Sequence, residues 1–72
     1  MNRKKDGVFP NLRAEMARKN VTITDLAKAL DLRIATVSVK LKTGKFTLKE
    51  AKIIKHYLDV DMSLEELFEE AV

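Results

Sequence analysis

The stretch DLAKALDLRIATVSVKLKTGK, residues 25–45, limits the possible folds of this chain more than any other. Its apolar residues recur every three or four positions in two short segments, 23–30 and 34–42, which is the spacing of one helical face. Three residues separate the segments, and the first of them is Asp31. Asp is among the residue types that best accept a left-handed backbone after glycine. We therefore expect two short helices that meet at a tight corner.

Helix-start patterns recur along the chain. TITD, TLKE and SLEE each place a hydroxyl residue three positions before an acid, as in a capping box. They predict helices that begin after Thr22, after Thr47 and after Ser63. An earlier helix over 11–19 would follow Pro10, which suits a first helical turn.

Left-handed residues should end two of these helices. Asn20 follows the segment 11–19, and Gly44 follows the segment 34–42. The helix that begins after Thr47 should continue to about Leu58. Since no segment alternates with a period of two, we expect no strands.

The chain is long enough for one domain only, at 72 residues. We predict an all-α, compact five-helix domain over 9–72, preceded by a basic flexible arm over 1–8. Its core should contain most of the large apolar residues: Phe9, Leu12, Met16, Val21, Leu26, Leu30, Leu32, Val37, Leu41, Phe46, Leu48, Ile54, Leu58, Leu64, Leu67 and Phe68.

Charge is divided unevenly along the chain. Residues 1–58 contain all 14 Lys and Arg and five of the 11 acids, a net +9, whereas residues 59–72 contain six acids and no base, a net −6. This division suggests a polyanion on one side and water or a basic partner on the other. The chain lacks cysteine and suits a reducing cytoplasm. No apolar run approaches the roughly 20 residues of a membrane span.

A family resemblance covers residues 11–68. LAKAL followed by ATVS and a basic turn, and then FTLKEAKIIKHYLDVDMSLEELF, resembles the helix-turn-helix domains of the Cro and lambda-type phage repressors. The resemblance implies a lambda-repressor-like fold and a sequence-specific transcriptional regulator that binds a palindromic operator in double-stranded DNA as a homodimer. The helix over 34–42 would enter the major groove, which admits an α-helix.

The chain departs from that family where bases should be read. Positions 34, 35 and 39 usually present base-reading side chains, and here they are Ile34, Ala35 and Val39. Ile23 replaces a common phosphate-binding Gln, and Arg33 replaces the usual Ser or Thr cap before the reading helix.

Three explanations of these apolar residues stay open. They would contact thymine methyl groups, with polar contacts from Thr36 and Ser38. Alternatively, Ile34 would join the apolar stripe of Val37 and Leu41 in the core. In the third, Ile23, Ile34 and Val39 would form an exposed patch for a protein partner or a second subunit.

Basic residues around the reading helix are candidates for phosphate contacts, which supply most of the affinity and its salt dependence. They are Lys28, Arg33, Lys40, Lys42 and Lys45. Arg3, Lys4 and Lys5 of the arm would either enter a minor groove or remain a loose tail.

No catalytic or metal site is expected. His56 is the sole histidine and has no cysteine beside it in sequence. Asp59, Asp61 and Ser63 fit the first positions of a calcium loop, but Leu64 stands where that loop requires glycine. We therefore predict no enzyme, no cofactor and no small-molecule substrate.

The functional prediction is a phage-type repressor in the bacterial or phage-infected cytoplasm, associated with the nucleoid. The alternative is a protein-interaction module or antirepressor that keeps the fold without base-specific reading. In a homodimer, the last helix and Val72 would form the interface.

Overall fold

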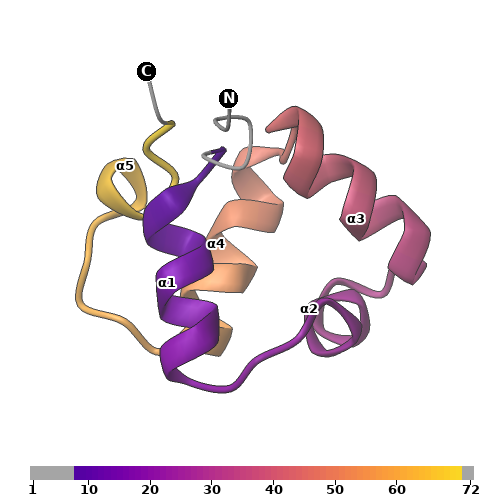
Figure 1. Ribbon diagram of the computed structural model, residues 1–72, viewed down its shortest axis with the longest axis horizontal. Helices are drawn as coiled ribbons and strands as arrows, with labels where there is room; N and C mark the ends of the chain where they lie inside the picture. Colours follow the sequence, from indigo (N-terminus) through magenta and orange to yellow (C-terminus); the bar gives the residue numbers. More distant parts are fainter. Residues whose placement is uncertain (1–7, 71–72) are drawn as a thin grey trace, which may run out of the picture.

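The computed structural model describes residues 8–70, and within them the chain is all-α with no strand. Five helices form where the sequence predicts them, which confirms the expected five-helix domain (Figure 1). They are α1 (Pro10–Arg18), α2 (Ile23–Leu30), α3 (Ile34–Thr43), α4 (Leu48–Leu58) and α5 (Leu64–Leu67).

Some predictions lie outside the described residues. They are the arm over 1–7, with its three basic side chains Arg3, Lys4 and Lys5, and the terminal Val72. Val8 was assigned to the arm, but it is half-buried and packs against the core. Val8 therefore belongs to the packed domain and not to the arm.

The predicted capping boxes begin three of the helices. In α2, the Thr22 hydroxyl accepts from the amide of Asp25 at 3.2 Å, and the Asp25 carboxylate accepts from the Thr22 amide at 2.9 Å. Thr47 and Glu50 make the same pair of bonds in α4, at 3.1 and 2.9 Å. Ser63 begins α5 in the same way. Each box satisfies two amides that the helix itself leaves unbonded.

Left-handed residues end the helices. Asn20 (φ 59°), Asp31 (φ 59°) and Gly44 (φ 74°) follow α1, α2 and α3, as the sequence predicts. Asp59 (φ 56°) ends α4 in the same way and was not predicted. The Asp31 conformation reverses the chain between α2 and α3, so that these two helices pack against each other.

Two of the core predictions need correction. Leu48 is 65% exposed, and Leu64 is only half-buried. Leu48 is the first residue of α4, where periodicity cannot show whether a neighbouring element reaches far enough to cover it. The large side chains that are fully buried come from all five helices: Leu12, Leu26, Val37, Ile54, Leu58 and Leu67.

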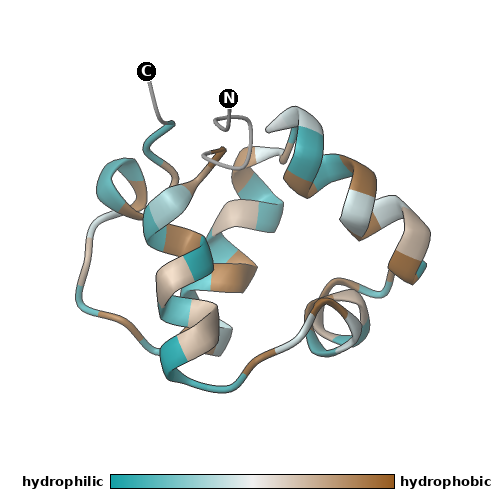
Figure 2. Cartoon of the chain, viewed as in Figure 1, coloured by the Kyte–Doolittle hydropathy of each residue, from teal (hydrophilic) through white to brown (hydrophobic). Residues whose placement is uncertain are grey.

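The packing leaves α3 at one side of the molecule. α2 packs against both α3 and α4, while α1 and α4 pack against α5. Figure 1 shows α5 and α3 on opposite sides of the α1 and α4 pair, with α2 below α3. The long outer side of α3 is consequently not covered by another described helix. Figure 2 shows hydrophobic and hydrophilic bands alternating along α3.

Candidate nucleic-acid interface

The burial of α3 side chains defines an inner and an outer face. Val37 and Leu41 are buried, at 0% and 3% exposure. Ile34 is 51% exposed and Val39 is 56% exposed. The alternative that placed Ile34 in the core with Val37 and Leu41 is therefore wrong, because about half of Ile34 is exposed to solvent.

The outer face carries a stripe of three small or apolar side chains. Ala35, Val39 and Thr43 follow one another at intervals of four residues, so they lie along one side of the helix. All three are exposed. They line a shallow hollow of about 510 Å³, together with Thr36, Lys40 and Lys45.

A second hollow lies where α2, the turn and α3 meet. Its volume is about 530 Å³, and it contains the predicted residues Lys28, Arg33 and Ile34. The rest of its lining comes from α2 and the turn: Thr24, Ala27, Asp31 and Leu32. Ile34 belongs to this hollow, and the next residue along the helix, Ala35, belongs to the other. The two hollows together contain eight of the ten predicted site residues, all except Ser38 and Lys42.

Four of the predicted phosphate ligands have no partner among the described residues, and three of them, Lys28, Arg33 and Lys45, line the two hollows. Lys28, Arg33, Lys42 and Lys45 are exposed, and none makes a side-chain hydrogen bond or ion pair within residues 8–70. Some other basic residues are held by acceptors of the chain itself, such as Arg13, which donates to the carbonyl of Val8 at 2.8 Å, whereas Lys49 and Lys52 on α4 are exposed and unpaired within residues 8–70. The free cations are therefore available for an external anion.

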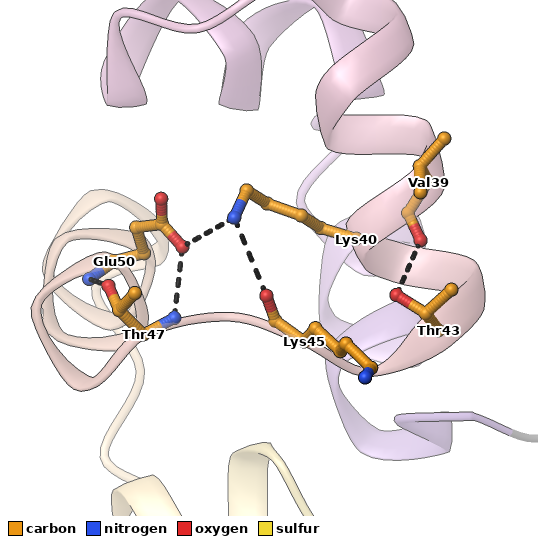
Figure 3. Close-up of polar contacts among 6 residues, drawn as sticks. All are labelled: Val39, Lys40, Thr43, Lys45, Thr47 and Glu50. Carbon is orange, nitrogen blue, oxygen red and sulfur yellow. Dashed lines mark hydrogen bonds and ion pairs between the residues drawn. The ribbon is translucent and has the colours of Figure 1, made fainter.

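Lys40 differs from these four. Its Nζ lies 3.3 Å from Glu50 Oε1, and the two side chains are only 23% and 18% exposed (Figure 3). The Lys40 ammonium also donates to the carbonyl of Lys45 at 3.5 Å. Lys40 was predicted as a phosphate ligand, but its ammonium faces α4.

The two hydroxyl residues that were expected to contact bases, Thr36 and Ser38, differ in their exposure. Thr36 is exposed and lines the hollow beneath the outer stripe. Ser38 is half-buried and lines neither hollow, and neither does Lys42. Ile23 is partly buried against the core, so it does not extend the exposed patch of Ile34 and Val39 as the third alternative required.

The amino terminus of α3 has no side-chain cap. Arg33 occupies the cap position with an extended backbone and makes no cap hydrogen bond. The first amides of α3 therefore lack the side-chain acceptor that Thr22 supplies in α2. Such amides, together with the helix dipole and a neighbouring guanidinium, favour an anion.

One acid, Asp31, lies in the turn before α3, and other acids lie farther from this end of the helix. α5 has Glu65 and Glu66 in its only turn, on the opposite side of the molecule from α3 (Figure 1). A Glu70 carboxylate oxygen lies near Gly44, at the carboxyl end of α3. Lys40 and Lys42 lie in the last turn there, and Glu50 is paired with Lys40. In the hollow at the turn, the two cations Lys28 and Arg33 thus outnumber the single acid Asp31.

Sequence reasoning missed two threonines of this surface. Thr43 completes the outer stripe, and its hydroxyl donates to the Val39 carbonyl at 2.9 Å (Figure 3). The interval of four residues from Val39 would have identified it. Thr24 lines the hollow at the turn, and no sequence signal singles it out.

Another hollow, of about 600 Å³, lies between α2 and α4. Ala29, Ile53 and Tyr57 form its apolar part, and Asp25, Lys28, Lys52 and His56 surround them. Among the described residues, no three His, Cys, Asp or Glu side chains gather closely enough to hold a metal ion. None of the helices in residues 8–70 has the length and apolar composition that crossing a bilayer requires.

Comparison with known proteins gives no relative from which the fold or this surface could be interpreted. No family model, no curated protein and no solved structure matches the chain.

Proposed function

We propose that this chain is a sequence-specific, double-stranded DNA-binding transcriptional regulator that inserts α3 into the major groove. One observation carries the proposal. The outer face of α3, with Val39 at 56% exposure, is not covered by another described helix, and unpaired cations border it on the α2 side and at its far end. A helix of this kind fits the width of the major groove.

The apolar stripe on α3 is suited to contact the thymine methyl group, the apolar part of the base edges in the major groove. Ala35 and Val39 cannot donate or accept a side-chain hydrogen bond, so they discriminate bases through the thymine methyl group. Thr36 and Thr43 add a hydroxyl and a methyl each on the same hollow. We infer that the preferred sites are rich in A·T pairs, with part of the specificity coming from DNA shape.

Phosphate contacts would orient the helix in the groove. Lys28 and Arg33 lie at the α2 side of α3, and Lys42 and Lys45 lie toward its far end. This arrangement would place cations along the phosphate strands on both sides of the groove. The uncapped amides at the start of α3 would receive one phosphate directly.

The assignment to the Cro and lambda-type repressor family is part of the same proposal. It rests on the motifs of residues 11–68 and on the short turn between α2 and α3. A homodimer would then bind two half-sites, whose centres are separated by about one turn of DNA, roughly 10 base pairs. We place its site of action at the nucleoid of a bacterial or phage-infected cell.

A second candidate function is a protein-interaction module, such as an antirepressor. The exposure of Ile34 and Val39 favours it, because large apolar side chains that are left in solvent can mark a protein interface. In this case α3 would bind a protein surface, and DNA binding would stay at the weak level of any basic chain.

Selection from random duplex DNA at physiological salt decides between the two. We expect a palindromic consensus from the unaltered chain and its loss from a double variant with Arg33→Ala and Lys42→Ala. A matched variant with Lys49→Ala and Lys52→Ala removes the same charge from exposed positions on α4 and should keep the consensus. Enrichment of no sequence, with only salt-sensitive background binding, would favour the protein-interaction module.

A further inference from the structure

Both the backbone carbonyl and the side-chain ammonium of Lys40 bond to the turn between α3 and α4. Its backbone carbonyl accepts from the amides of Gly44 and Lys45, at 2.8 and 3.3 Å. Its side chain then crosses the turn, where the ammonium donates to the Lys45 carbonyl at 3.5 Å (Figure 3). One residue thus bonds both the amide and the carbonyl of Lys45.

Glu50 ties the same ammonium to the start of α4. Its Oε1 atom lies 3.3 Å from Lys40 Nζ and also accepts from the Thr47 amide at 2.9 Å. A single carboxylate oxygen therefore serves both the capping box of α4 and the ion pair with α3. Because both charged side chains are less than a quarter exposed, the pair is sheltered from water and less screened than a surface pair.

We propose that Lys40 and Glu50 are positioning residues that fix the turn over 44–47, and so hold Lys45 where it meets DNA. Lys40 would not itself bind a phosphate, since its ammonium already faces Glu50 and the Lys45 carbonyl. This inference rests on the proposed DNA-binding function, and it removes Lys40 from the phosphate ligands that the sequence suggests.

The salt dependence of DNA binding tests the role of Lys40. Each phosphate contact contributes about 0.9 to the slope of log affinity against log salt concentration. The Lys45→Met variant should lose about that much slope. Lys40→Met should keep the slope of the unaltered chain and lower the affinity by about two- to fivefold, the size of effect expected from one ion pair. A slope loss in Lys40→Met equal to that of Lys45→Met would overturn the proposal.

Glu50→Gln tests the same proposal through the sign of its effect. Gln can replace Glu in a capping box, so the start of α4 should remain capped. Removal of an acid would by itself strengthen the attraction to DNA. The Gln oxygen still accepts from the Lys40 ammonium, but the contact is weaker without the negative charge, so the positioning role predicts the opposite, an affinity lower by up to about fivefold. Tighter binding by Glu50→Gln would contradict the positioning role.

Amide hydrogen exchange of the free protein separates this inference from the proposed function. Lys40→Met and Glu50→Gln should each speed exchange of the Gly44 and Lys45 amides, and the double variant should add little more. Lys40→Arg should restore protection, and Lys49→Met serves as the charge control on α4. Unchanged exchange in both single variants would overturn the inference, even for a chain that binds DNA. Absence of sequence-specific binding would refute the function instead.

Glu50→Gln keeps the inference testable if the Lys40→Met variant does not fold. It keeps the capping box and changes only one side-chain oxygen to an amide nitrogen, so we expect a folded chain by circular dichroism. The exchange of the Gly44 and Lys45 amides in Glu50→Gln then decides the inference by itself.

Discussion

The rings of Phe9 and Phe68 meet edge to face, with centroids 5.2 Å apart and planes at 82°. Phe46 completes the cluster at 6.0 Å from Phe9 and 5.9 Å from Phe68. The cluster therefore joins the start of the described chain, the turn after α3 and the end of α5. Since Phe46 lies two residues after Gly44, Phe9 and Phe68, from near the two ends of the described residues, help to hold the carboxyl end of α3.

Phe9→Ala should destabilise the domain by about 3–5 kcal/mol, because it removes a ring that is 3% exposed and leaves a cavity. That loss is a large fraction of the stability of so small a domain. Urea unfolding measures it. Tyr57→Ala, at an aromatic side chain that is 47% exposed, is the matched control and should cost much less. Equal losses in the two variants would contradict the anchoring role of Phe9.

Gly44→Ala should destabilise the domain by about 1–2 kcal/mol, because Gly44 has φ +74° and an L side chain is strained there. The added Cβ would also lie 3.3 Å from a Glu70 carboxylate oxygen. The long Glu70 side chain can move, so Glu70→Ala should not rescue the variant. Thermal unfolding compares the two, and full rescue by Glu70→Ala would show that crowding rather than backbone strain is responsible.

Ile34→Ala and Val39→Ala should each change the free energy of unfolding by about 0.5 kcal/mol or less, because both side chains are more than half exposed. Leu41→Ala on the inner face of the same helix should cost about 2–5 kcal/mol. Denaturant unfolding of the three variants tests the division of α3 into two faces. A large loss at Ile34 would place it in the core after all.

Replacement of thymine by uracil in the selected site tests methyl reading. Burying one methyl group contributes about 0.8 kcal/mol, so each contacted thymine should lose about fourfold in affinity when its methyl is removed. Val39→Ala should lose sensitivity to one such replacement. Uracil at uncontacted thymines is the control. A site whose binding does not change with any uracil would exclude methyl contacts but leave sequence-specific binding intact.

Glu50→Gln should flatten the loss of stability in acid. The amide of Thr47, together with the nearby Lys40, lowers the pKa of the Glu50 carboxyl below its ordinary value of 4.5. A lowered pKa stabilises the fold above 4.5, and this contribution is lost as the pH falls through the lower folded value. Unfolding free energies between about pH 6 and pH 3 should therefore fall less steeply in Glu50→Gln. Parallel curves would show that this carboxyl does not contribute.

Much of this fold could be predicted because it depends on interactions between residues that are close in sequence. The hydroxyl of Thr22 and the acid three residues later predict a helix start, because both hydrogen bonds of the capping box form within four residues. The left-handed turns at Asn20 and Gly44 are equally local, since they depend on what each residue type tolerates. The lack of a side-chain cap at Arg33 also follows from its residue type. No partner elsewhere in the chain is needed for any of these features.

The sequence by itself determined the five helices, their caps, the corner at Asp31 and the apolar identity of the residues on α3. Only the tertiary structure decided that Ile34 faces solvent, that Leu48 stays uncovered and that Lys40 turns toward Glu50. Exposure of Ile34 and Leu48 depends on how far a neighbouring helix extends, and helical periodicity carries no such information. The ion pair of Lys40 depends on how α4 is placed relative to α3, which no local sequence pattern specifies.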